Sequence, residues 1–157
     1  MAANLLLFLH ILFVLIFFGG TVVATVSGFR LATAKDVKEI AGLAQMNQVA
    51  EFGLIYPAYV LVGIFGWLTA WQQGWALTGT GWLTASYIVS GVALIMSVAI
   101  LSRFSMRLKA LATESLKQGS VSKPLAQLQA SKMPMMVSNF LHILLIFMLV
   151  LMVFKPF

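Results

Sequence analysis

The chain has 157 residues and no cysteine; 61% of the residues are hydrophobic, only 9% are charged, and the formal net charge is +6. Its mean hydropathy of +1.00 exceeds what the core of a water-soluble domain of this length requires, so the composition excludes an ordinary soluble protein. The lack of cysteine excludes disulfides, cysteine-ligated zinc and iron–sulfur clusters.

Four apolar stretches are long enough to cross a bilayer, which takes about 20 residues each. They are Asn4–Ser27, Asn47–Trp71, Trp82–Arg103 and Pro134–Phe154. The first has no basic segment before it and exceeds the length of a signal-peptide core, so we expect a permanent helix. The sequence therefore predicts an all-α integral membrane four-helix bundle that forms a single domain over residues 1–157.

The basic residues are sorted between the loops. Those between the first and second spans are Arg30, Lys35 and Lys38, and those between the third and fourth are Arg103, Arg107, Lys109, Lys117, Lys123 and Lys132. The loop 72–81 carries no charge. The positive-inside rule makes the two basic loops cytoplasmic and both termini external, as expected for a multi-pass protein of a bacterial inner (cytoplasmic) membrane. The net charge thus reflects topology, and the expected surroundings are lipid, with no nucleic-acid partner.

The basic loops carry helix signals. Asp36 and Glu39 follow Thr33, which we take as the N-cap of a helix that runs into the second span. Gly119 is expected to end an extension of the third span, and Ser122-Lys123-Pro124 to start a further short helix. The loops are therefore predicted to be folded.

Aromatic residues and helix breakers mark the second span. Trp67, Trp71, Trp75 and Trp82 surround the uncharged loop, which is typical of an aromatic belt at the outer interface; the alternative is a surface for stacking a quinone or porphyrin. Pro57 is expected to kink this span. The glycines expected to allow close helix approach are Gly19, Gly20, Gly63 and Gly66.

His10 is the main candidate for a functional site. The residues three and four positions away on its own helix are apolar, so the ring needs a partner elsewhere. A histidine inside the membrane is a functional-site hypothesis by default. Haem iron is the cofactor that a neutral imidazole in a helical bundle suggests, and the alternative is a structural hydrogen bond across helices.

His142 is a second candidate cofactor-binding residue, in the same pentapeptide Phe-Leu-His-Ile-Leu as His10. Counting from the outer ends of the spans at a rise of 1.5 Å per residue places His10 about 9 Å deep and His142 about 18 Å deep. Because Cα–Cβ bonds tilt towards the N-terminus of a helix and the two spans run in opposite directions, the bonds of His10 and His142 tilt towards opposite sides of the membrane. We therefore expect the two rings to lie apart rather than to bind the same haem.

Three charged residues form a third candidate site. Arg30 closes the first span, and Glu51 lies in the first turns of the second, on the same side. An acid at this depth favours a cationic partner, which Arg30 or Arg103 could supply as an interfacial ion pair. The alternative interpretation is an anchor for a haem propionate or a point of proton entry.

The motif Leu9-His10, followed by Phe17 and Gly19-Gly20, and the closing Met152-Val153-Phe154-Lys155-Pro156 support a family resemblance. They resemble a bacterial four-helix integral membrane family of unknown function, related to the copper-resistance protein D-like domain. The first helix is also similar to that of the membrane protoporphyrinogen oxidase family, which implies a haem-ligand role for His10. The Pro-Arg that follows the glycines in the oxidase family is absent here.

Three functions follow as hypotheses. The first is a membrane component that binds b-type haem through His10 for electron transfer. The second is a non-catalytic accessory or scaffold subunit without a cofactor, acting with other membrane proteins or as a homo-oligomer. The third, a transporter for a small solute or metal, lacks support because no inverted repeat is visible.

Overall fold

The computed structural model describes residues 2–156, which form four long helical rods. In chain order the elements are α1 (Ala2–Thr33), α2 (Val37–Val49), η1 (Ala50–Ile55), α3 (Tyr56–Gln72), α4 (Gly81–Met96), η2 (Ser97–Ser102), α5 (Arg103–Gln118), α6 (Lys123–Gln129) and α7 (Met133–Phe154). Four helices are long and apolar enough to span a membrane, and each contains one predicted span. The prediction of an all-α four-span bundle is confirmed.

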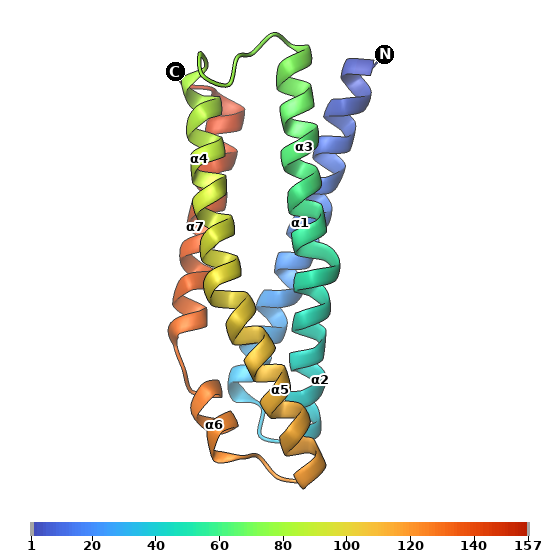
Figure 1. The fold of residues 1–157 in the computed structure, drawn as a ribbon, viewed down its shortest axis with the longest axis vertical. Coiled ribbons are helices and arrows are strands. Elements are labelled where there is room, and N and C mark those ends of the chain that lie inside the picture. Colours follow the sequence, from blue (N-terminus) through green and yellow to red (C-terminus); the bar gives the residue numbers. More distant parts are fainter. Residues whose placement is uncertain (1, 157) are drawn as a thin grey trace.

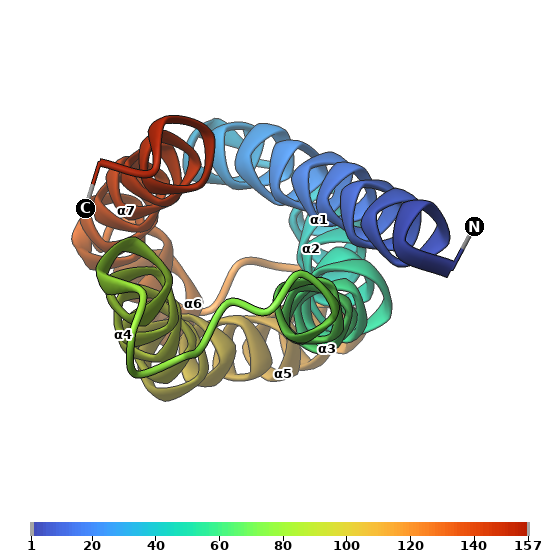
Figure 2. The same ribbon diagram turned by 90° about the horizontal axis from the view of Figure 1, so that it is seen from above.

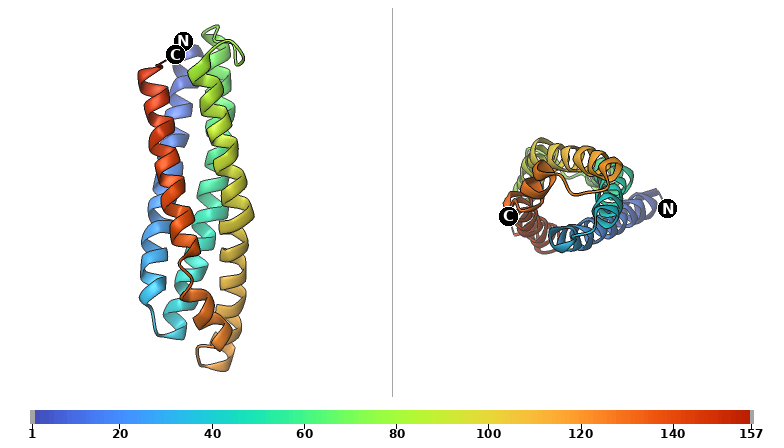
Figure 3. Two further views of the ribbon diagram at one scale, coloured as in Figure 1. Left: turned by 90° about the vertical axis from the view of Figure 1, so that its left-hand side faces the viewer. Right: turned by 90° about the horizontal axis from the view of Figure 1, so that it is seen from below.

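The rods run side by side, and both chain ends lie at the same end of the bundle (Figure 1 and Figure 3). We call this end the Trp end, after the tryptophans around the loop between α3 and α4. The opposite end, which contains α2, α5 and α6, is called the basic end. Along the bundle α1 packs on α3 and α4 packs on α7, whereas α2 and α5 meet at the basic end. Seen from the Trp end, the helices surround a central axis (Figure 2).

The outer surface of the rods is apolar and exposed. The exposed fractions of Leu15, Ile95 and Ile146 are 64%, 69% and 62%. The buried set includes small and polar side chains such as Ser27 and Ser86. This is the expected arrangement in lipid, where helix association depends on close packing and interhelical hydrogen bonds rather than on hiding apolar surface.

The basic end has a compact apolar core of its own. Its buried members are Leu31, Ala34, Ile40, Ala44, Leu108, Ala112 and Leu125. The side-chain amide of Gln129 in α6 donates to the carbonyl oxygens of Leu31 and Ala34, which ties the end of α1 to α6. The basic segments are therefore folded, as predicted.

Two of the three predicted boundary signals hold. Gly119 ends α5 with a left-handed φ of 71°, and the Ser122 hydroxyl caps α6 by accepting from the Leu125 amide. The prediction that Thr33 caps α2 is wrong. Thr33 is the last residue of α1, and the Asp36 carboxylate accepts the Glu39 amide at 3.1 Å.

The Trp end closes over a smaller cluster in which Ala70, Trp82 and Leu83 are buried. The ammonium group of Lys155 lies 4.2 Å from the ring centroid of Trp75, a cation–π contact. Trp67 and Trp71 are exposed, as an interfacial belt requires, but Trp82 is only 7% exposed. Trp82 is thus a packing residue.

Pro57 affects its helix through a change of helical pitch. The π-helical segment η1 directly precedes α3, in which Pro57 is in the first turn, and the Tyr56 amide donates to the Glu51 carbonyl five residues earlier. A wide turn of this kind relieves the clash between a proline ring and the preceding turn. A second π-helical segment, η2, lies in the neighbouring rod. Segments of this type occur often at functional sites.

Candidate functional site

Three cavities follow one another along the interior of the bundle. His10 lines the Trp-side cavity (about 290 Å³), His142 lines the middle cavity (about 110 Å³), and Glu51 lines the basic-side cavity (about 170 Å³). The Trp-side and middle cavities share Phe17, Tyr59, Leu145 and Met148. The middle and basic-side cavities share Ala24, Thr25, Ile55, Ser97, Leu101 and Ser138. The three candidate groups thus line one series of spaces.

His10 is held against α3. Its Nδ1 atom lies 3.0 Å from the carbonyl oxygen of Val62. Because a carbonyl oxygen only accepts, Nδ1 carries the proton, and Nε2 of the neutral ring keeps its lone pair. Nε2 has no hydrogen-bond partner among the described residues. The imidazole therefore has one unprotonated nitrogen without a protein partner among these residues, and His10 lines the Trp-side cavity.

Gly66 provides the room for this ring. A Cβ atom at Gly66 would lie 3.0 Å from Cε1 and 3.1 Å from Nδ1 of His10, closer than side chains normally approach. Gly20 has a similar role, since its Cβ would lie 2.9 Å from Cγ1 of Ile55. The close approaches predicted at Gly66 and Gly20 are present, whereas Gly19 and Gly63 have nothing within 4 Å.

Most hydroxyl groups around the Trp-side cavity are already paired with the protein. Tyr59 donates to the Ser90 carbonyl at 2.6 Å, and Ser86 donates to the Trp82 carbonyl at 2.8 Å. The remaining polar lining comes chiefly from the amide of Gln73 and the ammonium group of Lys155, towards the Trp end. Met148 and Met152 of α7 add thioether groups. The cavity is therefore largely apolar, with cationic and amide donors at one end.

His142 lies at another depth. Its Nδ1 atom is 2.7 Å from the Ser138 carbonyl, and its Nε2 atom is 3.5 Å from the Thr25 hydroxyl on α1. Thr25 is fifteen residues after His10 on the same helix, which corresponds to about 22 Å at 1.5 Å per residue. The two rings therefore cannot bind one haem from opposite faces, in line with the predicted difference in depth.

Glu51 is buried, with an exposed fraction of 7%, and its partners are hydroxyl groups. Its Oε1 accepts from Tyr56 at 2.9 Å and from Ser102 at 2.8 Å. Arg30 and Arg103 are exposed. The predicted ion pair between Glu51 and either arginine is therefore wrong for the described residues: the acid faces inward while both guanidinium groups face outward.

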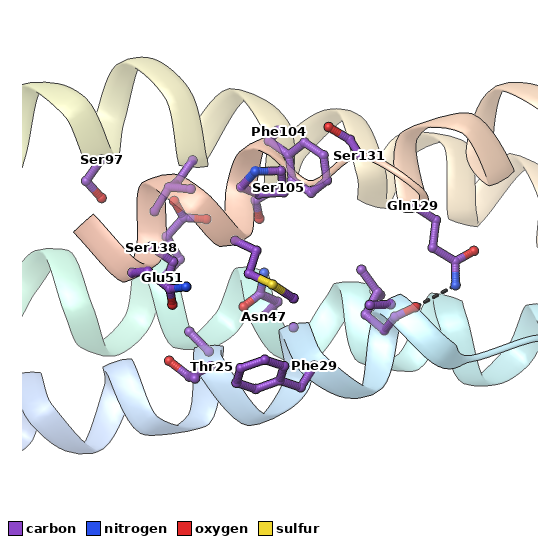
Figure 4. Close-up of a pocket in the computed structure, with 18 of the residues that line it drawn as sticks. Thr25, Phe29, Asn47, Glu51, Ser97, Phe104, Ser105, Gln129, Ser131 and Ser138 are labelled. Carbon is purple, nitrogen blue, oxygen red and sulfur yellow. Dashed lines mark hydrogen bonds between the residues drawn. The ribbon is translucent and has the colours of Figure 1, made fainter. Parts of the chain in front are cut away.

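Figure 4 shows the basic-side cavity, with Glu51 near Asn47, Thr25 and Ser138. Tyr56 extends the hydroxyl cluster, since its oxygen also contacts Ser102 and lies 3.2 Å from Oγ of Ser97. Tyr56 was not among the candidate residues predicted from the sequence. The signal for the cluster is the row of serines at 97, 102 and 105 in an otherwise apolar span.

Among residues 2–156 there is no group of three or more His, Cys, Asp or Glu side chains that could hold a metal ion. A haem differs from such a site because the porphyrin supplies most of the iron ligands and the protein supplies one or two. The single free nitrogen of His10 is sufficient for that kind of ligation.

The comparison with protein families agrees with this fold. The family described as "Predicted integral membrane protein (DUF2269)" matches residues 4–156. The chain belongs to this family. No curated protein and no solved structure matches this chain. Membership and the four apolar helices therefore establish this chain as an integral, multi-pass membrane protein embedded in lipid, and the role of its buried groups has to be argued from the structure.

Proposed function

We propose that this DUF2269 protein is a multi-pass protein of the bacterial inner membrane that binds b-type haem in the Trp-side cavity through His10 and takes part in electron transfer. The carrying observation is the state of the His10 ring. Its Nδ1 is anchored on the Val62 carbonyl, its Nε2 has no partner among the described residues, and the residue lines an apolar cavity.

Anchoring of one imidazole nitrogen is what a metal-binding histidine needs. Metal-bound histidines nearly always donate their second N–H to a carbonyl or carboxylate, which fixes both the tautomer and the ring orientation. Val62 supplies that carbonyl from α3, and Gly66 leaves room for the ring beside it. Both features support a ligand role for His10.

The position of the cavity between two helix pairs also fits a planar cofactor. At about 290 Å³ it is just below the range for ligand pockets, which is roughly 300–1,000 Å³. The haem macrocycle is larger, so binding requires the α4–α7 pair to move away from the α1–α3 pair. The loop 73–80 joins the pairs at this end without a helix or strand, so such a movement would have to break the contacts of its Trp75 with Trp82 and Lys155.

The residues that would hold the acidic side chains of haem are at the Trp end. Lys155 and Gln73 line this end of the cavity. Arg30, which we predicted as a propionate anchor, is twenty residues from His10 on α1, or about 30 Å along the helix. Arg103 begins α5, and Glu51 lines the basic-side cavity rather than the Trp-side cavity. These three are therefore unsuited to that role for a haem at His10.

Met148 and Met152 line the same cavity from α7, and a thioether is an established second ligand of haem iron. Haem would supply the one-electron chemistry. The contribution of the chain is to bind and orient it, and to exclude water with the apolar lining.

An absorption spectrum tests the proposal. The full chain is purified in detergent from cells supplemented with a haem precursor, beside the variants His10→Ala and His142→Ala. The expected result is a Soret band that His142→Ala retains and His10→Ala loses. A colourless wild-type protein, or a band unchanged in His10→Ala, would overturn the proposal, and a folded colourless protein would favour an accessory subunit.

A further inference from the structure

Glu51 is an acidic group in the membrane-spanning part of the bundle, and it has no cationic partner in the part of the chain that the structure describes. Among the charged and titratable groups around it, Arg30 on α1 and Arg103 on α5 are exposed, and the Lys109 ammonium group donates to the Gln48 amide instead. An ionised carboxylate costs several kcal/mol in such surroundings unless it is paired. The group must therefore take up a positive charge, as a proton or as a bound cation.

Only one of its two oxygens is engaged by the protein. Oε1 accepts both hydrogen bonds, from Tyr56 and Ser102, and Oε2 has no partner among the described residues. From α7 the cavity receives the hydroxyl of Ser138, and His142 lies a turn further along in the adjoining middle cavity. No group on α7 or α1 offers Glu51 a permanent positive charge. Oε2 is thus the free atom of the cluster.

The cavity at Glu51 is suited to water. The hydroxyl of Ser105 is buried and has no hydrogen-bond partner within residues 2–156, although Ser105 lines this cavity. A buried polar atom without a protein partner normally binds an ordered water. A water needs about 10–15 Å³, so a cavity of about 170 Å³ can hold several.

The same cavity extends to the basic end of the bundle. Its lining includes Gln129 at the end of α6 and Ser131 in the connection to α7, both outside the apolar part of the fourth span (Figure 4). Asn47 lies between these residues and Glu51. Polar groups therefore follow the cavity from the basic end to the carboxyl group.

We propose that Glu51 is a proton-binding carboxyl group, which exchanges its proton with water at the basic end through the basic-side cavity. The proton resides on Oε2 while Oε1 keeps its two hydroxyl donors. A metal cation would need several further oxygens converging on one point. The arrangement does not provide them, because Asn47 already accepts from Ser27 and Oε1 is already engaged. The proposal is independent of any haem at His10.

Infrared spectroscopy of the full chain in lipid nanodiscs tests proton binding. Titration should reveal the C=O stretch of a protonated carboxyl group, shifted in D₂O and absent from Glu51→Gln. The control is Glu114→Gln, the same change at an exposed site on α5, which should leave the band intact. A band that persists in Glu51→Gln would overturn the proposal, and so would its displacement by Na⁺ at constant ionic strength, which would indicate a cation site.

Water access is tested separately, so that a misfolded Glu51→Gln variant does not decide the matter. Because the chain has no cysteine, a single introduced thiol is unique. Ser138→Cys lines the cavity, and Phe140→Cys lies two residues away on the exposed face of α7. A small cationic thiosulfonate should modify Ser138→Cys at least about tenfold faster, since only a hydrated thiol ionises. Equal, slow rates would overturn the proposed path.

Discussion

The Cα of Gly66 faces the His10 ring so closely that a Cβ atom added there would lie 3.0 Å from Cε1 of the imidazole. The same ring is tied to α3 by the Val62 carbonyl, four residues earlier. One turn of α3 therefore both binds the ring and makes room for it, and the space at position 66 is part of the candidate site.

Gly66→Ala should disturb the His10 ring. The added methyl group overlaps a ring that its hydrogen bond holds in place, and overpacking of this kind typically costs about 1–3 kcal/mol. Gly63→Ala, one turn earlier on α3, has nothing within 4 Å and should be tolerated. Thermal unfolding in detergent compares the two, and equal melting temperatures would contradict the close contact.

Gly20→Ala should destabilise the bundle relative to Gly19→Ala. The Cβ at position 20 would lie 2.9 Å from Cγ1 of Ile55 and 3.1 Å from Cβ of Leu54, whereas position 19 is open. Both changes gain the same helix propensity, so their difference isolates overpacking, typically about 1–3 kcal/mol. Denaturant unfolding of this adjacent pair measures it. A Gly20→Ala variant as stable as Gly19→Ala would show that α1 and η1 are further apart.

The spans, and the need of His10 for a partner outside its own helix, could be predicted from the sequence, because hydropathy and the scarcity of polar residues in lipid are local properties. The hydrogen-bond partners of Glu51 could not be predicted in this way. At about 100° per residue a regular α-helix places residues five apart at about 140° to one another, so Tyr56 was not expected beside Glu51. The π-helical turn changes that spacing and brings the phenol to the carboxylate. The rotation of each helix about its axis similarly places Arg30 and Arg103 on the outer surface. Their distance from Glu51 along the sequence does not reveal this orientation.

Asp36→Ala should destabilise the basic end, whereas Thr33→Ala should not. The Asp36 carboxylate caps α2 through the Glu39 amide, and loss of an N-cap typically costs about 1 kcal/mol. The Thr33 hydroxyl donates within α1, to the Arg30 carbonyl, and is exposed. Hydrogen exchange of the α2 amides distinguishes them. Faster exchange in Thr33→Ala than in Asp36→Ala would restore Thr33 as the cap.

The orientation of the bundle can be tested with single cysteines. Thr78→Cys lies in the uncharged loop at the Trp end, and Ser120→Cys lies between α5 and α6 at the basic end. The positive-inside rule predicts that a membrane-impermeant maleimide labels Thr78→Cys on intact bacterial cells, and Ser120→Cys only after permeabilisation. The opposite pattern would place both termini in the cytoplasm.

Tyr56→Phe should weaken the link between the second and third rods. The phenol donates to Glu51 and contacts Ser97 and Ser102 of η2, so its removal leaves buried polar atoms short of a partner. Such a loss typically costs about 1–3 kcal/mol. The matched control is Tyr87→Phe, whose hydroxyl makes one longer hydrogen bond, of 3.3 Å, to the Gly63 carbonyl. Unfolding in detergent should show the larger loss for Tyr56→Phe.

Because Oε1 of Glu51 would keep only Ser102 as a donor in Tyr56→Phe, the infrared carboxyl band of Glu51 should also shift, while Tyr87→Phe leaves that band unchanged. A Tyr56→Phe protein with wild-type stability and an unshifted band would show that the hydroxyl cluster does not hold the acid.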